Sequence, residues 1–151
     1  MKTYDFIGVF SEGYAKVKLN GMWGLIDGEG NEIVPPEYVQ VGEFHEGLVA
    51  VKLKQEPHNW GFINKTGKVV VPPRYDDVAN FYLGYASVLF DGYWGYINTQ
   101  GNEVIPCVFY SEDSLPLKQD IPTLLDVPTM SLLIKTYRGE QNENLQPRIR
   151  H

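Results

Sequence analysis

Few side chains in this chain combine the residue types and the spacing that catalysis requires. Glu56 and His58 lie two residues apart in the polar stretch 54–59, where a carboxylate and an imidazole could exchange a proton with a substrate. No third group that would orient the imidazole is visible nearby, and a deep pocket with such a carboxylate would be needed to favour an enzyme. We therefore expect a surface insertion whose first use would be contact with a partner.

The other reactive residue types stand alone. Cys107 is the single cysteine and has no neighbouring histidine or glycine-rich turn, which predicts an inert thiol. Asp76 and Asp77 are adjacent, and adjacent side chains of a strand point to opposite faces, so they cannot easily share a metal ion. The sequence also lacks a zinc-binding pattern, a phosphate-binding glycine loop and a nucleophile elbow. We expect no enzymatic activity, no cofactor and no metal.

Charge and hydrophobicity argue against two classes of partner. The chain has 19 acidic and 13 basic residues, which gives a net charge of -6. Nucleic-acid binding needs a concentrated basic face, which such a chain does not offer. No stretch is long and apolar enough to span a membrane, and the first residues carry no apolar signal-peptide region. We expect a cytoplasmic protein that binds neither nucleic acid nor membrane.

Three Trp-Gly pairs divide the chain into similar segments. After each pair, an aromatic residue or Leu, an Ile, an Asp or Asn, a Gly and a Pro follow at fixed distances. The recurring large residues and glycines are Trp23, Trp60, Trp94, Gly24, Gly61, Gly95, Tyr38, Tyr75, Phe44 and Phe81. A residue that recurs in every copy most often packs one copy against the next. We therefore assign these residues to the core, with tryptophan rings filling the seams and each glycine allowing a neighbouring backbone to approach.

Glycine and proline positions indicate β-structure. Each copy has a polar turn with a glycine at a fixed place between two short β-branched or aromatic runs, which is typical of a hairpin. Asn20-Gly21 and Asp91-Gly92 predict a further two-residue turn ahead of the Trp-Gly strand. Each copy is thus predicted to be a meander of three strands. We expect Pro35-Pro36 and Pro72-Pro73 to end the third strand, because proline cannot donate to a sheet ladder.

The repeats are expected to form one domain, residues 1–110. The predicted units are about 10–43, 44–80 and 81–110, preceded by a half-unit at 4–10. Residues 111–151 have a different composition, with one aromatic residue, Tyr137, and one glycine, Gly139. Their apolar residues recur at helical spacing over residues 128–138, which predicts a short helix that caps the last repeat or docks on another molecule, followed by a loose polar end.

This pattern resembles that of the WG-repeat family, also called KWG repeats, which occurs in many bacterial proteins. The resemblance covers about residues 4–110 and rests on the Trp-Gly pair, the turn glycine and the Pro-Pro-x-Tyr-x-x-Val-x-x-Phe run recurring in register. The third copy departs from it with Pro106-Cys107 in place of two prolines. The resemblance implies an all-β repeat array. It implies no catalytic residues, and the role usually inferred for the family is that of an interaction module.

We therefore predict an all-β fold: an open, curved array of about three β-meander repeats with a short C-terminal helix. A partial propeller is the alternative. The predicted function is a non-catalytic, repeat-built module for protein–protein interaction or self-association. Tyr82, Phe90 and Tyr93 are expected to be exposed contact residues, together with Glu56 and His58. The alternative function is a carbohydrate or cell-wall binding protein that uses exposed aromatic rings as stacking platforms.

Overall fold

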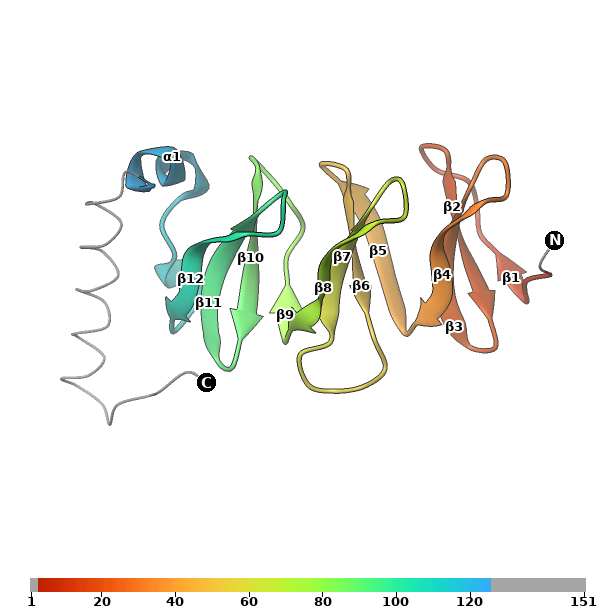
Figure 1. Ribbon diagram of the computed structural model, residues 1–151, viewed down its shortest axis with the longest axis horizontal. Coiled ribbons are helices and arrows are strands. Elements are labelled where there is room, and N and C mark those ends of the chain that lie inside the picture. Colours follow the sequence, from red (N-terminus) through yellow and green to blue (C-terminus); the bar gives the residue numbers. More distant parts are fainter. Residues whose placement is uncertain (1–2, 126–151) are drawn as a thin grey trace.

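The protein is a row of three separate antiparallel sheets (Figure 1). The computed structural model describes residues 3–125. The first sheet contains β1 (Phe6–Ile7), β2 (Tyr14–Leu19), β3 (Met22–Asp27) and β4 (Glu32–Tyr38). The second contains β5 (Gln40–His45), β6 (Leu48–Lys52), β7 (Trp60–Asn64) and β8 (Val69–Tyr75). The third contains β9 (Asp77–Val78), β10 (Tyr85–Phe90), β11 (Tyr93–Asn98) and β12 (Glu103–Phe109).

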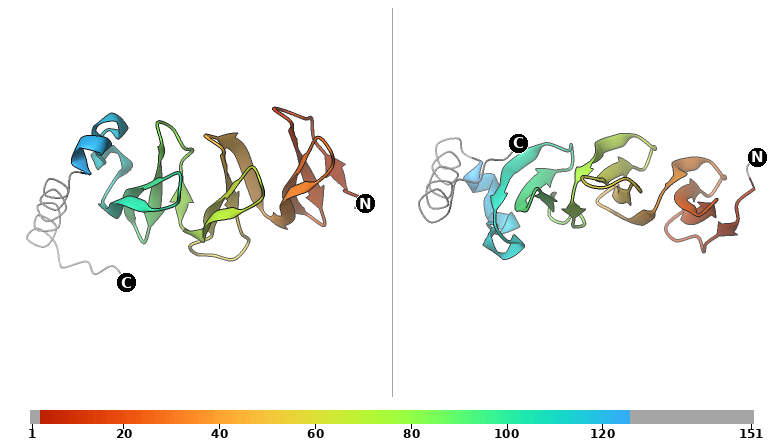
Figure 2. Two further views of the ribbon diagram at one scale, coloured as in Figure 1. Left: turned by 45° about the horizontal axis from the view of Figure 1, so that its top comes forward. Right: turned by 90° about the horizontal axis from the view of Figure 1, so that it is seen from below.

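Each strand pairs with the strand next to it in sequence, so every sheet is an open meander. The two further views in Figure 2 show the sheets following one another along the long axis of the molecule. The predicted all-β open array is confirmed. Each sheet has four strands, however, where the sequence predicted three per copy.

The additional strand precedes the first hairpin of each copy. In the first sheet it is β1, which comes from the segment predicted as a half-unit. β1 and β9 are only two residues long, and β5 is interrupted by a register shift between Val41 and Phe44. Strands this short or irregular do not show the clear period-two alternation on which the sequence prediction rested.

The prolines do not end the third strand of each copy, contrary to the prediction. β4 runs through Pro35-Pro36 to Tyr38, and Trp23 pairs with Tyr38 while Leu25 pairs with Val34. The extra residues form a bulge, where a proline does not have to donate to the ladder.

This bulge explains the glycine of the Trp-Gly pair. A Cβ atom on Gly24 would overlap the carbonyl oxygen of Val34 and lie 2.9 Å from the carbonyl carbon of Pro35. Gly61 and Gly95 face the same obstacle from β8 and β12. The predicted close approach of a neighbouring backbone at this position is confirmed.

The Asp or Asn that follows the Trp-Gly strand holds the next turn in place. The Oδ1 atom of Asp27 accepts hydrogen bonds from the backbone N–H groups of Glu29 (2.9 Å) and Asn31 (2.8 Å). Asn64 and Asn98 accept the equivalent pair of bonds in the second and third sheets. The residue type recurs because only a short side chain with an acceptor oxygen can close this turn.

Except between β6 and β7, where the insertion lies, two-residue turns with positive φ at both residues join the other hairpins. Asn20-Gly21 and Asp91-Gly92 form such turns, as predicted. Glu12-Gly13, Glu46-Gly47 and Leu83-Gly84 form them too, although Glu and Leu are unusual at positive φ and gave no turn signal in the sequence.

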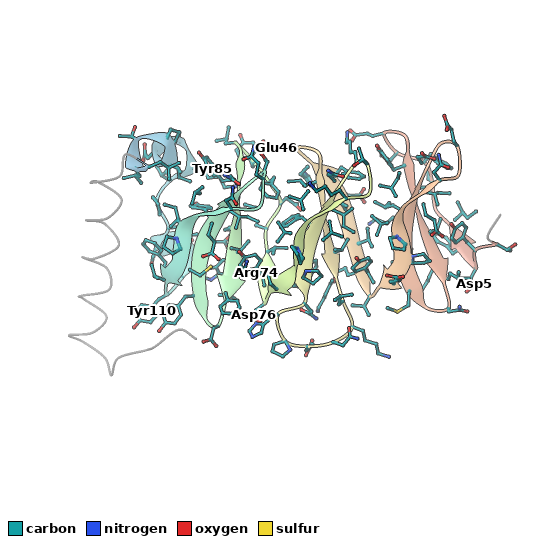
Figure 3. The ribbon with its side chains drawn as sticks, in the orientation of Figure 1. Asp5, Glu46, Arg74, Asp76, Tyr85 and Tyr110 are labelled. Carbon is teal, nitrogen blue, oxygen red and sulfur yellow. The ribbon has the colours of Figure 1, made fainter. Side chains whose placement is uncertain are left out.

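The turns at Asn20 and Asp91 are each anchored by an aspartate. Asp5 accepts the N–H of Asn20 (2.9 Å), and Asp76 accepts that of Asp91 (2.7 Å). Figure 3 labels both aspartates along the same edge of the row. The two anchors occupy equivalent places in the first and third sheets, so the same hairpin is fixed in the same way in both.

The buried side chains collect in seams between successive sheets. The seam between the first and second sheets holds Leu25, Val34, Tyr38, Val41, Val49, Val51 and Ile63, and that between the second and third holds Leu48, Ala50, Phe62, Val71, Tyr75, Phe81, Ala86, Val88, Tyr93, Ile97 and Cys107. Trp23, Trp60 and Trp94 are only partly buried and pack at the edges of these clusters, so they do not fill the seams as expected. Phe44 is also partly buried.

Tyrosines at matching positions tie strands together through acidic partners. The Tyr4 hydroxyl donates to Glu32 (2.6 Å), and the Tyr75 hydroxyl, at the end of the second sheet, donates to Glu103 of the third (3.0 Å). Burial of the phenol, followed by the nearby carboxylate, raises the pKa of Tyr4 to about 12 and also raises the pKa of Tyr75. Both groups therefore remain neutral donors at physiological pH.

A short helical segment covers the outer face of the third sheet. It consists of η1 (Glu112–Ser114), η2 (Lys118–Asp120) and the short C-terminal helix α1 (Ile121–Leu124). Leu115 and Ile121 are buried against Tyr96, Ile105 and Phe109. The last repeat is thus capped by residues 112–124, and the helix predicted over residues 128–138 lies outside the described residues.

Candidate binding groove

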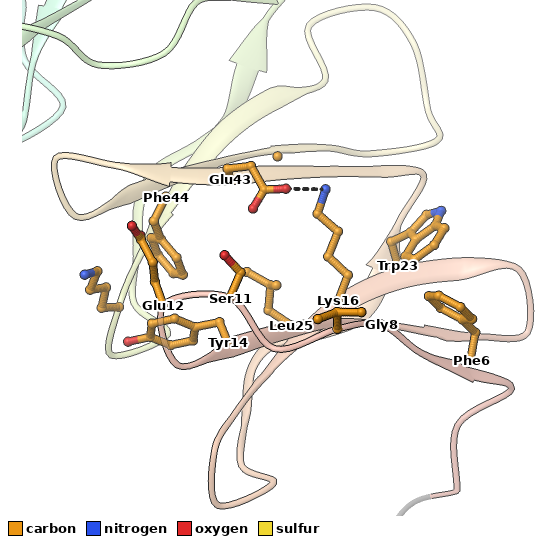
Figure 4. Close-up of a pocket in the computed structure, with 13 residues that line it drawn as sticks. Phe6, Gly8, Ser11, Glu12, Tyr14, Lys16, Trp23, Leu25, Glu43 and Phe44 are labelled. Carbon is orange, nitrogen blue, oxygen red and sulfur yellow. Dashed lines mark ion pairs between the residues drawn. The ribbon is translucent and has the colours of Figure 1, made fainter.

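A groove opens between the first and second sheets, with a volume of about 210 Å³ (Figure 4). Four aromatic rings and four charged side chains line it: Phe6, Tyr14, Trp23 and Phe44, and Glu12, Lys16, Glu43 and Lys65. They come from β1, the turn before β2, β2 and β3 on one side, and from β5 and the turn between β7 and β8 on the other. The sheets hold both walls, so the groove is a feature of the folded array rather than of one loop.

The residue at the position of Lys16 in β2 differs between the three sheets, and it decides whether the space beside it is open or filled. Lys16 pairs with Leu25, as Ala50 pairs with Phe62 in the second sheet and Ser87 with Tyr96 in the third. In the second seam the small Ala50 leaves space for Phe81, whose ring packs edge-on against Phe62 at 4.8 Å.

In the third sheet the cap takes the corresponding space. Ser87 donates a hydrogen bond to Glu112, and the Tyr96 hydroxyl donates to the carbonyl oxygen of Pro116 at 3.0 Å. In the first seam, Lys16 is too long and too polar to be covered in this way. Its ammonium group instead reaches Glu43 of the second sheet at 3.1 Å, and the groove remains beside this ion pair.

The Lys16–Glu43 ion pair is readily opened. The side chain of Lys16 is 35% exposed and that of Glu43 is 69% exposed. Solvent-exposed pairs of this kind stabilise a fold by only about 0–1 kcal/mol. A ligand that separates the two charges therefore loses little of its binding free energy.

The aromatic walls are fixed by contacts among themselves and with lysines. Phe6 meets Trp23 edge-on at 5.8 Å, and Tyr14 packs against Phe44 at 4.7 Å. The Lys65 ammonium lies 5.9 Å from the centre of the Tyr14 ring and 5.7 Å from that of Phe44. These contacts hold the rings in position before any ligand binds, which lowers the entropy cost of binding.

The structure does not bring the three predicted aromatic contact residues together. Tyr82 is 64% exposed and lies beside the β9–β10 turn, with the Lys118 ammonium 5.6 Å from its ring. Phe90 and Tyr93 flank the turn at the other end of β10 and β11. Figure 3 labels Tyr85, which bridges to Tyr82, and Tyr110, which contacts Tyr93, at opposite edges of the row.

Exposure also differs from the expectation at two of these residues. Tyr93 is 3% exposed, which contradicts its prediction as an exposed anchor. It occupies an inward position at the start of β11, within the seam between the second and third sheets. Phe90 is partly buried because the His58 ring stacks on it at 4.7 Å.

The insertion at residues 54–59 is tied to the third sheet through Asp76. The Nδ1 atom of His58 lies 2.7 Å from the Oδ1 atom of Asp76. The same oxygen accepts the backbone N–H of His58 at 3.0 Å. Asp76 is the orienting carboxylate that the sequence did not reveal, because it lies 18 residues further along the chain.

This cluster lacks a hydroxyl or thiol nucleophile. The hollow beside it, of about 220 Å³, is lined by Lys52, Glu56, Pro57, His58, Asn59 and Asp76. That lining includes no Ser, Thr or Cys, and the second Asp76 oxygen is used by the turn at Asp91. The arrangement holds the insertion against the neighbouring hairpin, and Glu56 is exposed at its rim.

Two further features concern the chemistry of the described residues. Cys107 is 2% exposed, with its Sγ atom 3.8 Å from the carbonyl oxygen of Val88. Within residues 3–125, no three His, Cys, Asp or Glu side chains are grouped so that they could hold a metal ion. The helical segments of this part of the chain are also too short to cross a membrane.

The family model for the WG containing repeat matches residues 2–23, 23–55, 60–94 and 94–111. The chain belongs to the WG-repeat family. The complete matches each begin at a tryptophan and span the last two strands of one sheet and the first two of the next. One WG repeat therefore links two successive sheets covalently, and the two partial matches complete the first and third sheets. No curated protein and no solved structure matches this chain.

Sequence reasoning did not identify the groove. The available signal was Lys16 at an inward strand position where the other copies have Ala50 and Ser87. Its meaning depends on the neighbouring sheet, which the sequence pattern does not place. Phe6 and Glu43 gave no signal, because they lie on the short additional strands.

Proposed function

We propose that this WG-repeat protein is a non-catalytic interaction module that binds an apolar side chain of a partner protein in the groove between its first two sheets. The observation that carries the proposal is the contrast between the seams. The second seam is filled by Phe81 and the third sheet is covered by its cap, whereas the first seam keeps an aromatic-walled opening beside a weak ion pair.

The size and charge of the groove indicate the type of ligand. A volume of about 210 Å³ is smaller than the roughly 300–1,000 Å³ of typical small-molecule sites, and suits one or two side chains of an extended peptide. Lys16 and Lys65 are balanced by Glu12 and Glu43, so the lining has no net charge. Recognition would therefore rest on an aromatic or large aliphatic anchor, with polar groups on either side of it.

The exposed rings are less suited to binding sugars. Stacking of a sugar needs an open ring face, but a lysine ammonium lies over Trp23 at 5.1 Å and over Trp60 at 5.7 Å. Tyr82 is covered in the same way by Lys118. These contacts favour a protein ligand over a carbohydrate.

A random peptide library displayed on phage and selected against the full chain tests the proposal. We expect enrichment of peptides that share an aromatic or large aliphatic residue. Their affinity for the Lys16→Glu variant should fall at least tenfold, because this change places a second carboxylate against Glu43 and repels it into the groove. The matched control is Lys54→Glu, which makes the same charge change at an exposed position of the insertion, outside the residues that line the groove.

Two results would contradict the proposal. Peptides that bind the Lys16→Glu variant as tightly as the parent would place the site elsewhere. Failure to enrich any peptide, combined with retention of the chain on a polysaccharide column, would favour the carbohydrate-binding alternative.

A further inference from the structure

The segment Phe6–Phe10 differs from its equivalents in the other two sheets. It reads Phe-Ile-Gly-Val-Phe, whereas residues 40–44 read Gln-Val-Gly-Glu-Phe and residues 77–81 read Asp-Val-Ala-Asn-Phe. All three include the first strand of a sheet, which lies at the sheet edge. Comparison of the three segments shows which positions are both apolar and exposed in the first sheet alone.

Two of its positions are those that contact a preceding sheet elsewhere. The residues equivalent to Ile7 and Phe10 are Val41 and Phe44 in the second sheet, which pack against the first sheet, and Val78 and Phe81 in the third, which pack against the second. In the first sheet these positions stay open: Ile7 is 52% exposed and Phe10 is 48% exposed.

The turn glycines repeat this contrast. A Cβ on Gly67 would lie 2.9 Å from the carbonyl oxygen of Ile33 in the first sheet, and one on Gly101 would lie 3.0 Å from that of Val70 in the second. A Cβ on Gly30, the equivalent residue of the first sheet, would meet nothing within 4 Å. In the described part of the chain, the outer face of the first sheet therefore has the contact positions of a seam but no sheet packed on them.

The other two positions are apolar in the first copy only. The second and third copies place Gln40 and Glu43, or Asp77 and Asn80, at the outward positions of this segment, and all four are exposed. The first copy places Phe6 and Val9 there, at the mouth of the groove that they also line, and they are 49% and 90% exposed. An apolar edge strand without charge is a surface that pairs with another chain unless something covers it.

We propose that this edge is a self-association surface: a second copy of the chain docks on it about a two-fold axis, with Phe6–Phe10 of one copy against Phe6–Phe10 of the other. The segment carries no charge, so two identical copies face each other without like-charge repulsion. The equivalent segments of the second and third sheets carry Glu43 and Asp77, so the same arrangement would bring two like charges into one contact.

The opposite end of the array determines the form of the assembly. Leu115 and Ile121 already cover the outer face of the third sheet, so a second copy cannot add there in a head-to-tail manner. Among the described residues, the uncovered contact positions lie on the first sheet, and pairing through them about a two-fold axis closes after two copies rather than extending into a fibre. Four side chains per copy give a contact smaller than the roughly 800 Å² per partner of a standard interface, so we expect a weak dimer with a dissociation constant of about 10–100 μM.

Sedimentation velocity of the full chain between about 1 and 500 μM tests the proposal. The average mass should rise from that of one chain toward that of two and go no higher. The test variant is Phe6→Gln/Val9→Glu, which installs the two residues that the second copy carries at these positions. It should stay monomeric over the whole range. Since Phe6 is half exposed and Val9 is almost fully exposed, circular dichroism should report an unchanged fold.

The matched control is Val69→Glu, which also replaces an exposed apolar residue of a strand. The other two copies carry a glutamate at this position, Glu32 and Glu103. It should dimerise like the parent. A parent chain that remains monomeric at 500 μM would overturn the proposal, and so would a test variant that dimerises as well as the parent or an average mass that continues to rise beyond two chains. Phe6 and Val9 also line the groove, so the two proposals are separated by using the parent chain in both tests. A parent that dimerises without enriching any peptide supports self-association alone, and a parent that binds peptides but stays monomeric supports the groove alone.

Discussion

Replacing Gly24 by alanine should destabilise the protein strongly, because the bulged strand β4 crosses this position. The new Cβ would overlap the carbonyl oxygen of Val34 and lie 2.9 Å from both the carbonyl carbon of Pro35 and the nitrogen of Pro36. All three obstacles are backbone atoms, and two belong to prolines with a fixed φ, so they cannot rotate away as a side chain would.

The magnitude follows from the movement that is required. Ordinary carbon contacts begin near 3.4 Å, so β4 must shift by more than half an ångström, away from the ladder that pairs Trp23 with Tyr38. Forced shifts of this kind typically cost about 1–3 kcal/mol, and loss of the paired Trp23–Tyr38 contact adds to that figure. We therefore expect the free energy of unfolding to fall by about 2–4 kcal/mol.

Urea unfolding, followed by tryptophan fluorescence, measures the change, with a lower midpoint and an unchanged slope as the expected result. Gly28→Ala is the matched control, because a Cβ at Gly28 would meet nothing within 4 Å and its φ lies outside the left-handed region. That variant should stay within about 0.5 kcal/mol of the parent, or become slightly more stable. A Gly24→Ala protein as stable as the Gly28→Ala protein would refute this explanation of the Trp-Gly pair.

Three further predictions concern the cap, a turn and a buried phenol. Ile121→Ala should lower the free energy of unfolding by about 2–4 kcal/mol in the same urea titration, because the side chain is fully buried in the cap. The control Leu117→Ala, at a 61% exposed site, should change the free energy of unfolding by less than about 0.5 kcal/mol. Hydrogen bonds from Asn31 lower the pKa of the Asp27 carboxyl from 3.8. The ionised carboxylate therefore stabilises the fold above that pH, and this stabilisation is lost as the pH falls below it. Asp27→Asn should remove this acid sensitivity while preserving the turn, as measured by thermal unfolding between pH 3 and 7. Burial raises the pKa of Tyr75 above its usual value of 10.0. The neutral phenol therefore stabilises the fold fully below pH 10, and this stabilisation is lost as the pH rises beyond that value. An absorbance titration of Tyr75→Phe should lack one of the late-ionising tyrosines of the parent. A variant that loses only an early-ionising tyrosine would contradict the last of these.

The repeat and its hairpins could be predicted from the sequence because they depend on local chemistry. An Asn-Gly or Asp-Gly turn, a Trp-Gly pair at constant spacing and an Asp or Asn that closes a turn express their roles within a few residues. The same local reasoning failed at Pro35-Pro36, because a proline normally ends a strand and only the pairing of Trp23 with Tyr38 reveals a bulge. It also failed at Leu83, whose positive φ is imposed by the hairpin and not by the residue type.

The candidate site could not be predicted because it depends on contacts between sheets. Lys16 and Glu43 are 27 positions apart, and nothing near either residue shows that they meet. His58 and Asp76 form a similar distant pair, which holds the insertion to the third sheet. Tyr93 was expected to be exposed because it sits next to a turn, but its inward direction on β11 places it in a seam.

The positions of the tryptophans allow a direct test of the groove. Each sheet carries one tryptophan, and only Trp23 lines the groove. The three indole N–H groups therefore give three nitrogen–proton correlation signals, one for each sheet. We would titrate the ¹⁵N-labelled chain with the peptide selected from the library, at a chain concentration low enough to keep it monomeric. The account predicts that the Trp23 indole signal shifts with saturation while those of Trp60 and Trp94 stay in place. A shift of the Trp60 or Trp94 signal with no change at Trp23 would contradict it.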